Sequence, residues 1–132
     1  MKDVRRRQII EAFTQGWEVL QSKGIWWNGF EREGKYEEWW ANGKKHIVAF
    51  YKNGKLDGKY NKWRSDGKEW IEAFYKNGKL DGKYRSWWNS GNKHIEAFYK
   101  NGKLEGEYKE WWKNGNLIRH VLYYNGEKVK NL

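Results

Sequence analysis

The 132-residue chain is long enough for one domain, and its composition narrows what that domain can be. It contains no cysteine, which excludes disulfide scaffolds and thiolate metal sites. Its net charge of +10 favours anionic partners, although a lysine-rich surface that only aids solubility is an equal alternative. Residues 1–7 lack the apolar run of a signal peptide and no stretch is apolar enough to span a bilayer, so we expect a cytoplasmic protein.

The chain begins with a segment that we expect to be an amphipathic helix over residues 3–23. Its apolar residues recur at steps of three and four, which places them on one stripe of an α-helix; they are Ile9, Phe13, Trp17 and Leu20. Asp3 suits the N-cap, and Gly24 suits the left-handed position that ends a helix. We therefore expect residues 1–24 to form a helix that caps the open end of a second domain, residues 25–132.

Three consecutive basic residues, Arg5, Arg6 and Arg7, lie near the start of this expected helix. They more often form a solvated helix face, and binding of phosphate groups is the alternative. The sequence leaves both interpretations open.

A period of 24 residues dominates the chain from Ile25 onward. Twelve of the 15 glycines lie on three series with this spacing: Gly34, Gly58, Gly82 and Gly106; Gly43, Gly67, Gly91 and Gly115; and Gly54, Gly78, Gly102 and Gly126. Two aromatic series follow the same step: Tyr36, Tyr60, Tyr84 and Tyr108, and Trp39, Trp63, Trp87 and Trp111. A fixed period is typical of repeat proteins, in which each unit packs mainly on its neighbours. We expect function to reside on an extended surface rather than in one catalytic pocket.

Turn signals divide each period into two strands. Asn-Gly pairs, with one Asp-Gly and one Ser-Gly pair, recur at 28–29, 42–43, 53–54, 66–67, 77–78, 90–91, 101–102, 114–115 and 125–126. Such pairs supply the positive φ angles of type I′ hairpin turns. The segments between them are rich in aromatic and β-branched residues, which favour strands. The sequence predicts a mainly β fold, a single-layer antiparallel β-meander of about eight strands in four hairpins.

The alternation of side chains along a strand predicts two aromatic faces. Each tyrosine of the first strand shares a face with the residue four positions later, namely Trp40, Arg64, Trp88 or Trp112. Trp39, Trp63, Trp87 and Trp111 then point to the other face. In the second strand, Ile71, Ala73 and Tyr75 are expected on one face, with Trp70, Glu72 and Phe74 opposite. Because a single sheet has no second layer, stacked rings should supply much of its cohesion, and most tryptophans should be core residues.

The repeat unit resembles the MORN repeat, and more closely the variant found in bacterial YwqK-type antitoxins. Three units carry the MORN spacing: Gly34-Tyr36-Trp40-Gly43, Gly82-Tyr84-Trp88-Gly91 and Gly106-Tyr108-Trp112-Gly115. The second unit has Arg64 in place of the tryptophan, and the usual mid-motif glycine is replaced by Glu38, Lys62, Ser86 and Glu110. The resemblance implies an extended β-meander that binds proteins, oligomerises or, in some eukaryotic members, contacts acidic lipids. The antitoxin branch implies a partner toxin.

No residue cluster predicts catalysis or a cofactor. One active site seldom arises identically in four repeats, and we find no constellation that breaks the repeat symmetry. His46 and His94 occupy the same repeat position two units apart, so they should not converge on a metal. Asp57, Asp81 and Glu105 each precede a turn glycine and are expected to serve turn geometry. We expect a protein that is not an enzyme and that needs no metal or cofactor.

Two binding hypotheses remain. In the favoured one, an aromatic surface binds a protein partner, and the antitoxin resemblance suggests a toxin or effector that it neutralises; the candidates are Trp39, Trp63, Trp87, Trp88 and Trp111. In the other, a basic rim binds nucleic acid or an acidic membrane; the candidates are Lys55, Lys79, Lys103, Arg5, Arg6 and Arg7. The sequence leaves the oligomeric state open.

Overall fold

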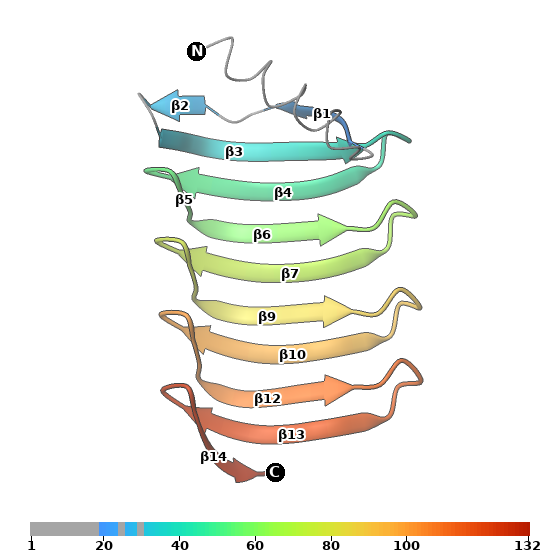
Figure 1. The fold of residues 1–132 in the computed structure, drawn as a ribbon, viewed down its shortest axis with the longest axis vertical. Helices are drawn as coiled ribbons and strands as arrows, with labels where there is room; N and C mark the ends of the chain where they lie inside the picture. The colour runs from blue at the N-terminus through green and yellow to red at the C-terminus, as the bar shows by residue number, and fades with distance from the viewer. Residues whose placement is uncertain (1–18, 24–25, 29–30) are drawn as a thin grey trace.

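The structure is a computed structural model that describes residues 19–23, 26–28 and 31–132. These residues form one sheet of fourteen strands, drawn in Figure 1. The strands are β1 (Val19–Lys23), β2 (Trp26–Asn28), β3 (Glu31–Trp40), β4 (Lys45–Lys52), β5 (Lys55–Leu56), β6 (Gly58–Trp63), β7 (Glu69–Lys76), β8 (Lys79–Leu80), β9 (Gly82–Trp87), β10 (Lys93–Lys100), β11 (Lys103–Leu104), β12 (Gly106–Trp111), β13 (Leu117–Tyr124) and β14 (Glu127–Asn131).

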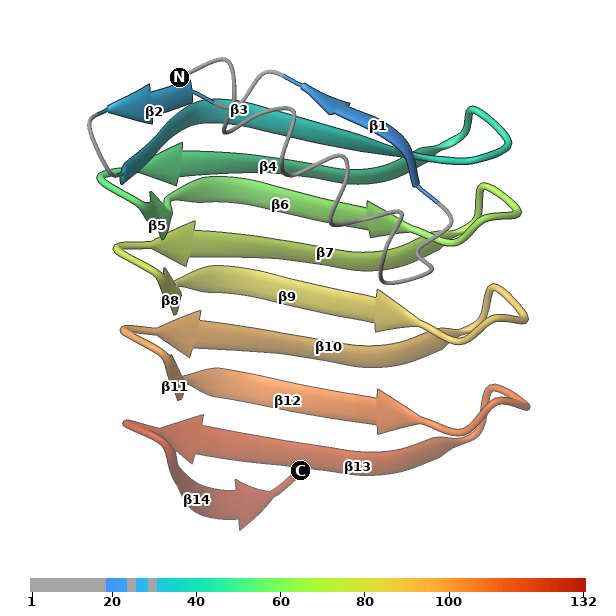
Figure 2. The same ribbon diagram turned by 45° about the horizontal axis from the view of Figure 1, so that its top comes forward.

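The sheet is an open antiparallel meander, as the sequence predicts. Its main order is β1-β3-β4-β6-β7-β9-β10-β12-β13-β14, while the short strands β2, β5, β8 and β11 pair beside it. The eight long strands from β3 to β13 form four hairpins of the 24-residue period, and Figure 2 shows their turns stacked along the two edges of the sheet. Within the described residues the chain forms a single layer without a helix.

The N-terminal edge of the sheet is covered by strands. The expected helix over residues 3–23 is wrong for Val19–Lys23, which form β1 and pair antiparallel with β3. β2 pairs with the other end of β3. The physical reason is that the outer edge of β3 presents unpaired backbone groups, which neighbouring strands satisfy. The remainder of the expected helix, including Arg5, Arg6 and Arg7, lies outside the described residues, and the division of the chain near Gly24 stays a prediction.

The turns at one edge of the sheet are the predicted type I′ turns. Their asparagines have φ angles of 50–52° and are followed by glycines with φ of 77–85°; the pairs are Asn53-Gly54, Asn77-Gly78, Asn101-Gly102 and Asn125-Gly126. Each turn is hydrogen-bonded to the preceding repeat, as when the Gly78 N–H donates to the Leu56 carbonyl at 2.8 Å. The stacked turns thereby join neighbouring repeats along this edge.

The turns at the opposite edge differ from the prediction. Here the glycine has a positive φ and the residue before it does not; the pairs are Asn42-Gly43, Asp66-Gly67, Ser90-Gly91 and Asn114-Gly115. The Gly43 N–H donates to the Trp40 carbonyl, and the Asn42 side chain accepts from the Lys44 N–H at 3.0 Å. This pattern fits a three-residue hairpin loop that ends in a left-handed glycine. The polar residue serves as a hydrogen-bond acceptor here, so its own φ need not be positive.

The core is a row of small side chains between tyrosines. Ala49, Ala73, Ala97 and Val121 are between 0 and 5% exposed, and each lies directly opposite a tyrosine of the paired strand. Each of these tyrosines makes an edge-to-face contact with a second tyrosine, at centroid distances of 5.7–6.3 Å: Tyr36–Tyr51, Tyr60–Tyr75, Tyr84–Tyr99 and Tyr108–Tyr123. Alternating large and small residues bury apolar area in a sheet that has no second layer, and the ring contacts add about 0.5–1.5 kcal/mol each.

Candidate binding surfaces

The two faces of the sheet carry different side chains. We call the face with the alanine row and its tyrosines the Tyr face. We call the opposite face, which carries Phe50, Phe74 and Phe98, the Phe face; these rings are 38, 36 and 43% exposed. The phenylalanines follow the 24-residue period, so the sequence carries a periodic signal for them, but they are not among the residues that we predicted to bind a partner.

A row of tryptophans runs across the Phe face. Trp39, Trp63, Trp87 and Trp111 are half-buried and lie at the same place in successive hairpins, as the alternation predicts. Their cross-strand partners are Lys45, Glu69, Lys93 and Leu117. The Lys93 Nζ lies 5.7 Å from the Trp111 ring centroid, and the Arg85 guanidinium lies 5.8 Å from that of Trp87. Both cations are also ion-paired, Arg85 with Glu72 at 2.6 Å and Lys93 with Glu96 at 3.2 Å, so the Phe face combines partly exposed rings with opposite charges that pair with each other. The fifth candidate, Trp88, lies on the Tyr face.

The basic rim is found along the type I′ edge. Lys55, Lys79 and Lys103 are exposed on β5, β8 and β11, one in each successive repeat. The stem of each lysine lies along the turn glycine of the next repeat, as for Lys55 and Gly78. The acids of this edge serve the turns: Asp57 Oδ2 accepts the Asn77 N–H at 3.2 Å, and Glu105 Oε2 accepts the Asn125 N–H at 2.7 Å. For these two acids the predicted turn role is confirmed.

A ladder of stacked pairs follows the other edge of the Tyr face. Trp40 stacks on His46 and Trp88 stacks on His94, with centroids 3.8 and 3.9 Å apart. In the repeat between them, the Arg64 guanidinium lies 4.5 Å from the Trp70 centroid. Trp70 also lies 4.3 Å from the Lys62 ammonium. The expectation that Trp70 lies opposite Ile71 is wrong, because a β-bulge between Glu69 and Ile71 turns its ring onto the Tyr face.

These pairs also connect successive repeats, which explains the departure at Arg64. Trp40 Nε1 donates to the Trp63 carbonyl at 3.1 Å, and Trp88 Nε1 donates to the Trp111 carbonyl at 2.9 Å. Arg64 Nη2 donates to the equivalent carbonyl of Trp87 at 2.9 Å. Arginine therefore keeps both functions of the tryptophan it replaces, the ring contact and the hydrogen bond to the next repeat.

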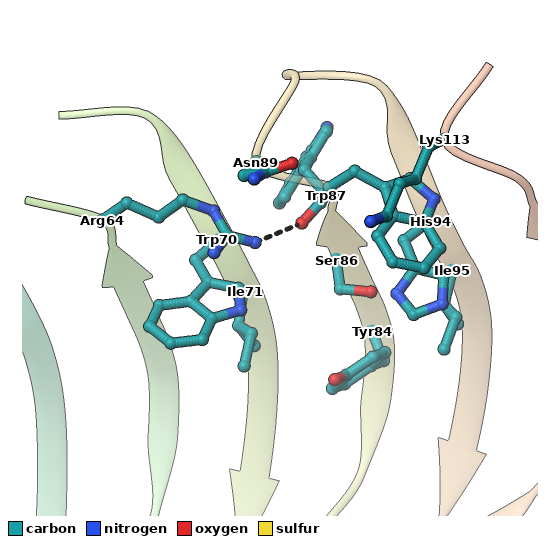
Figure 3. A pocket seen from close by; sticks show the side chains of 11 residues that line it. Arg64, Trp70, Ile71, Tyr84, Ser86, Trp87, Asn89, His94, Ile95 and Lys113 are labelled. Atoms are coloured by element: carbon teal, nitrogen blue, oxygen red, sulfur yellow. Dashed lines mark hydrogen bonds between the residues drawn. The ribbon is translucent and has the colours of Figure 1, made fainter. Parts of the chain in front are cut away.

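A hollow of about 490 Å³ opens on the Tyr face beside Ser86. Its polar lining includes Arg64, His94 and Lys113, and its apolar walls include Trp70, Trp88, Ile71 and Ile95. Figure 3 shows the Ser86 and Tyr84 side chains between Arg64 and Trp70 on one side and His94 on the other. Ser86 is one of the four residues that replace the mid-motif glycine. The available signal was that serine is the only small residue among them.

Burial and hydrogen bonding shift several pKa values on the Tyr face. Burial raises the pKa of Tyr60 to about 12, and the nearby Tyr75 and Tyr51 hydroxyls act in the same direction. Burial alone would raise the pKa of Glu38. Hydrogen bonds with His46 and Tyr36 outweigh that effect and place the pKa of Glu38 below its usual value. The Glu38 carboxylate is therefore held in its charged form by its neighbours.

His46 and His94 lie on the same ladder, two repeats apart, as expected. Within the described residues, no group of three or more His, Asp or Glu side chains is placed to hold a metal ion. The described part of the chain also has no helix that is long and apolar enough to cross a membrane.

Comparison with known families accounts for the repeat. A family model described as the MORN repeat variant matches residues 32–53, 80–101 and 104–125, which make up half of the chain. The segment between the first two matches contains Arg64, where the sequence departs from the repeat pattern. A search of curated proteins found no match. Repeats of this kind are generally associated with binding to proteins or membranes. The chain therefore belongs to the MORN repeat variant family.

Proposed function

We propose that the protein is a non-enzymatic scaffold that binds a protein partner through its Phe face. The observation that carries this proposal is the repetition of aromatic side chains on that face, with the exposed Phe50, Phe74 and Phe98 in one row and the four half-buried tryptophans in another. Between the two rows lie polar residues that include Glu72, Arg85 and Glu96, so the face presents repeated rings with charged groups among them. Aromatic rings are also enriched among the residues that dominate protein interfaces.

The partner that we favour is a toxin or effector protein that the scaffold neutralises by covering it in the cytoplasm. A broad, regular face suits this task, because repeats present the same contacts several times along an extended surface.

A second candidate function rests on Lys55, Lys79 and Lys103, which form an exposed basic row at the type I′ edge. Such a row could bind acidic lipid headgroups or a nucleic-acid backbone. Two matched triple variants separate the candidates. Phe50, Phe74 and Phe98 are changed to Ser in one, and Lys55, Lys79 and Lys103 are changed to Glu in the other. The lysine variant lowers the formal net charge from +10 to +4, two units for each residue.

The experiment measures three interactions for each variant. Partners are captured from an extract of the source cells, identified and purified, and their affinity is then measured by calorimetry. Binding to phosphatidylserine vesicles and to single-stranded oligonucleotides is measured at low and at physiological salt. We expect the phenylalanine variant to lose partner affinity by at least about tenfold while the lysine variant keeps it. Salt-dependent vesicle or oligonucleotide binding that only the lysine variant loses would instead establish the second function. Circular dichroism verifies that both variants are folded.

A further inference from the structure

The first and third repeats place nearly the same residues around one position of the Tyr face. Residues 48 positions apart are identical around it: Tyr36 and Tyr84, Trp40 and Trp88, His46 and His94, and Ile47 and Ile95. The position itself differs, because it is Glu38 in the first repeat and Ser86 in the third. The protein therefore contains two versions of one side-chain arrangement, one with a carboxylate at its centre and one without.

The first repeat shows what this arrangement binds. The Glu38 side chain is buried, at 6% exposure of the residue, and its Oε2 lies 2.8 Å from His46 Nδ1. The Tyr36 hydroxyl donates a hydrogen bond to the other carboxylate oxygen. A tyrosine hydroxyl, an imidazole and a stacked tryptophan thus surround a carboxylate group.

The third repeat keeps these neighbours and lacks the carboxylate. Ser86 is also 6% exposed, and its hydroxyl makes no hydrogen bond of ordinary geometry among the described residues, although its proximity to the Tyr84 hydroxyl opposes the rise in the pKa of Tyr84 that burial causes. The side chain is shorter than that of glutamate, and the hollow of about 490 Å³ opens at this place. A buried hydroxyl without a partner is unfavourable unless a ligand or solvent satisfies it.

The hollow has gained a cation that the repeat pattern does not supply. Arg64, which occupies the position of the repeat tryptophan, lines the hollow. The buried Nε of its guanidinium has no hydrogen-bond partner among the described residues. The Lys113 Nζ lies above the Trp88 ring at 5.5 Å. None of the described residues that line the hollow is acidic. Next to the hollow, the Glu110 carboxylate of β12 lies on the other side of His94, with its Oε2 3.9 Å from His94 Nε2.

We propose that the hollow beside Ser86 is a binding site for a small organic carboxylate that carries a planar apolar group. Its carboxylate would take the place that Glu38 fills in the first repeat, near the Tyr84 hydroxyl and His94, with the Arg64 guanidinium at the wall of the hollow. Its apolar part would lie between Trp70 and Trp88. The volume lies within the range of about 300–1,000 Å³ usual for small-ligand sites. This site is on the opposite face from the proposed protein-binding surface, so it does not depend on that function.

The test is a titration of the full chain with benzoate, monitored by NMR of the tryptophan indole N–H groups and the histidine rings. We expect shifts confined to Trp70, Trp88 and His94. Benzoate should bind at least about tenfold more tightly than its neutral isostere benzamide and than inorganic phosphate. Ser86→Glu should abolish the binding by placing the chain's own carboxylate in the hollow. Ser86→Ala, the matched control, should retain a hollow and bind benzoate within about fivefold of the unchanged protein.

Several results would overturn the proposal. They are equal shifts with benzoate and benzamide, phosphate binding as strong as benzoate binding, and the absence of shifts up to about 20 mM benzoate. A terminally blocked peptide with one glutamate tests the alternative source of a carboxylate. If it binds about tenfold more tightly than benzoate, the site receives an acidic side chain of a protein rather than a small acid. Should Ser86→Glu not fold, the comparison of benzoate with benzamide on the unchanged protein still decides. Loss of partner binding on the Phe face would leave this titration unaffected.

Discussion

The pair Arg64 and Trp70 offers a direct test of how neighbouring repeats are joined. The first and third repeats use a tryptophan stacked on a histidine at these positions, and the second uses an arginine over a tryptophan. If the two arrangements are equivalent, the double variant R64W/W70H should reproduce the pair Trp40–His46. The single variants R64A and W70H should each break it.

The contacts set the expected magnitudes. R64A removes a hydrogen bond of 2.9 Å from a charged donor to the Trp87 carbonyl, worth about 1.5–3 kcal/mol. It also removes a cation–π contact at 4.5 Å, worth about 0.5–1 kcal/mol at a partly exposed site. We therefore expect R64A to lower the free energy of unfolding by about 2–4 kcal/mol and W70H by about 1–2 kcal/mol. The double variant should stay within about 1 kcal/mol of the unchanged protein, because it regains a ring stack and an indole donor.

The assay is equilibrium unfolding in urea, monitored by far-UV circular dichroism and by tryptophan fluorescence. Coincident transitions for the two probes allow a two-state treatment, and unchanged m-values show that the same surface is exposed on unfolding. A double variant that loses about as much as the sum of R64A and W70H, about 3 kcal/mol or more, would refute the equivalence of the two pairs.

Three further predictions concern single residues. In thermal unfolding, Gly82→Ala should lower the stability by about 1 kcal/mol more than Gly91→Ala does. Gly82 has a φ of +120°, and an added Cβ would lie 3.3 Å from Phe74 Cβ, whereas an added Cβ at Gly91 would meet open space. Equal losses of stability would contradict this prediction. The pKa of Tyr60 rises from 10.0 to about 12 on folding. The contribution of Tyr60 to stability should therefore be complete below pH 10 and lost as the pH rises through 12. Tyrosinate absorbance should appear at a higher pH in the native protein than in the unfolded chain. The pKa of Glu38 falls on folding, so its contribution to stability is present above pH 4.5 and is lost as the pH falls through the folded value. In urea unfolding, Glu38→Gln should lower the stability at neutral pH and weaken the loss of stability at acid pH. A variant that loses as much stability at acid pH as the unchanged protein would show that Glu38 does not cause this loss.

Much of the fold could be predicted from the sequence because its signals are local. A positive φ is a property of one residue, so the Asn-Gly pairs determine where hairpins turn, independently of what packs against them. The strand alternation between these turns then assigns each tyrosine of the first strand to one face and Trp39, Trp63, Trp87 and Trp111 to the other. Repetition at 24 residues extends one hairpin into the whole sheet, which is why the meander was predictable.

The candidate site was predictable only in part. The tryptophan row of the Phe face and the lysine row follow from spacing, and the structure places each in line. The placement of Trp70 did not follow from spacing, because one bulge reverses the alternation of a strand locally. The class of turn at Asn42-Gly43 depended on a hydrogen bond from the Lys44 N–H to the Asn42 side chain.

The sequence by itself determined the repeat, the hairpins and the two faces. Only the tertiary structure decided that strands cover the N-terminal edge, that Arg64 lies over Trp70, and that a hollow opens beside Ser86. The reason is that these features arise between repeats. Arg64 donates to a carbonyl 23 residues further along the chain, and the residues around Ser86 come from β7, β9, β10 and three turns, including Lys113 in the turn between β12 and β13. Their contacts depend on strand register and on the volume of each side chain beside its neighbours, neither of which is encoded in any single unit.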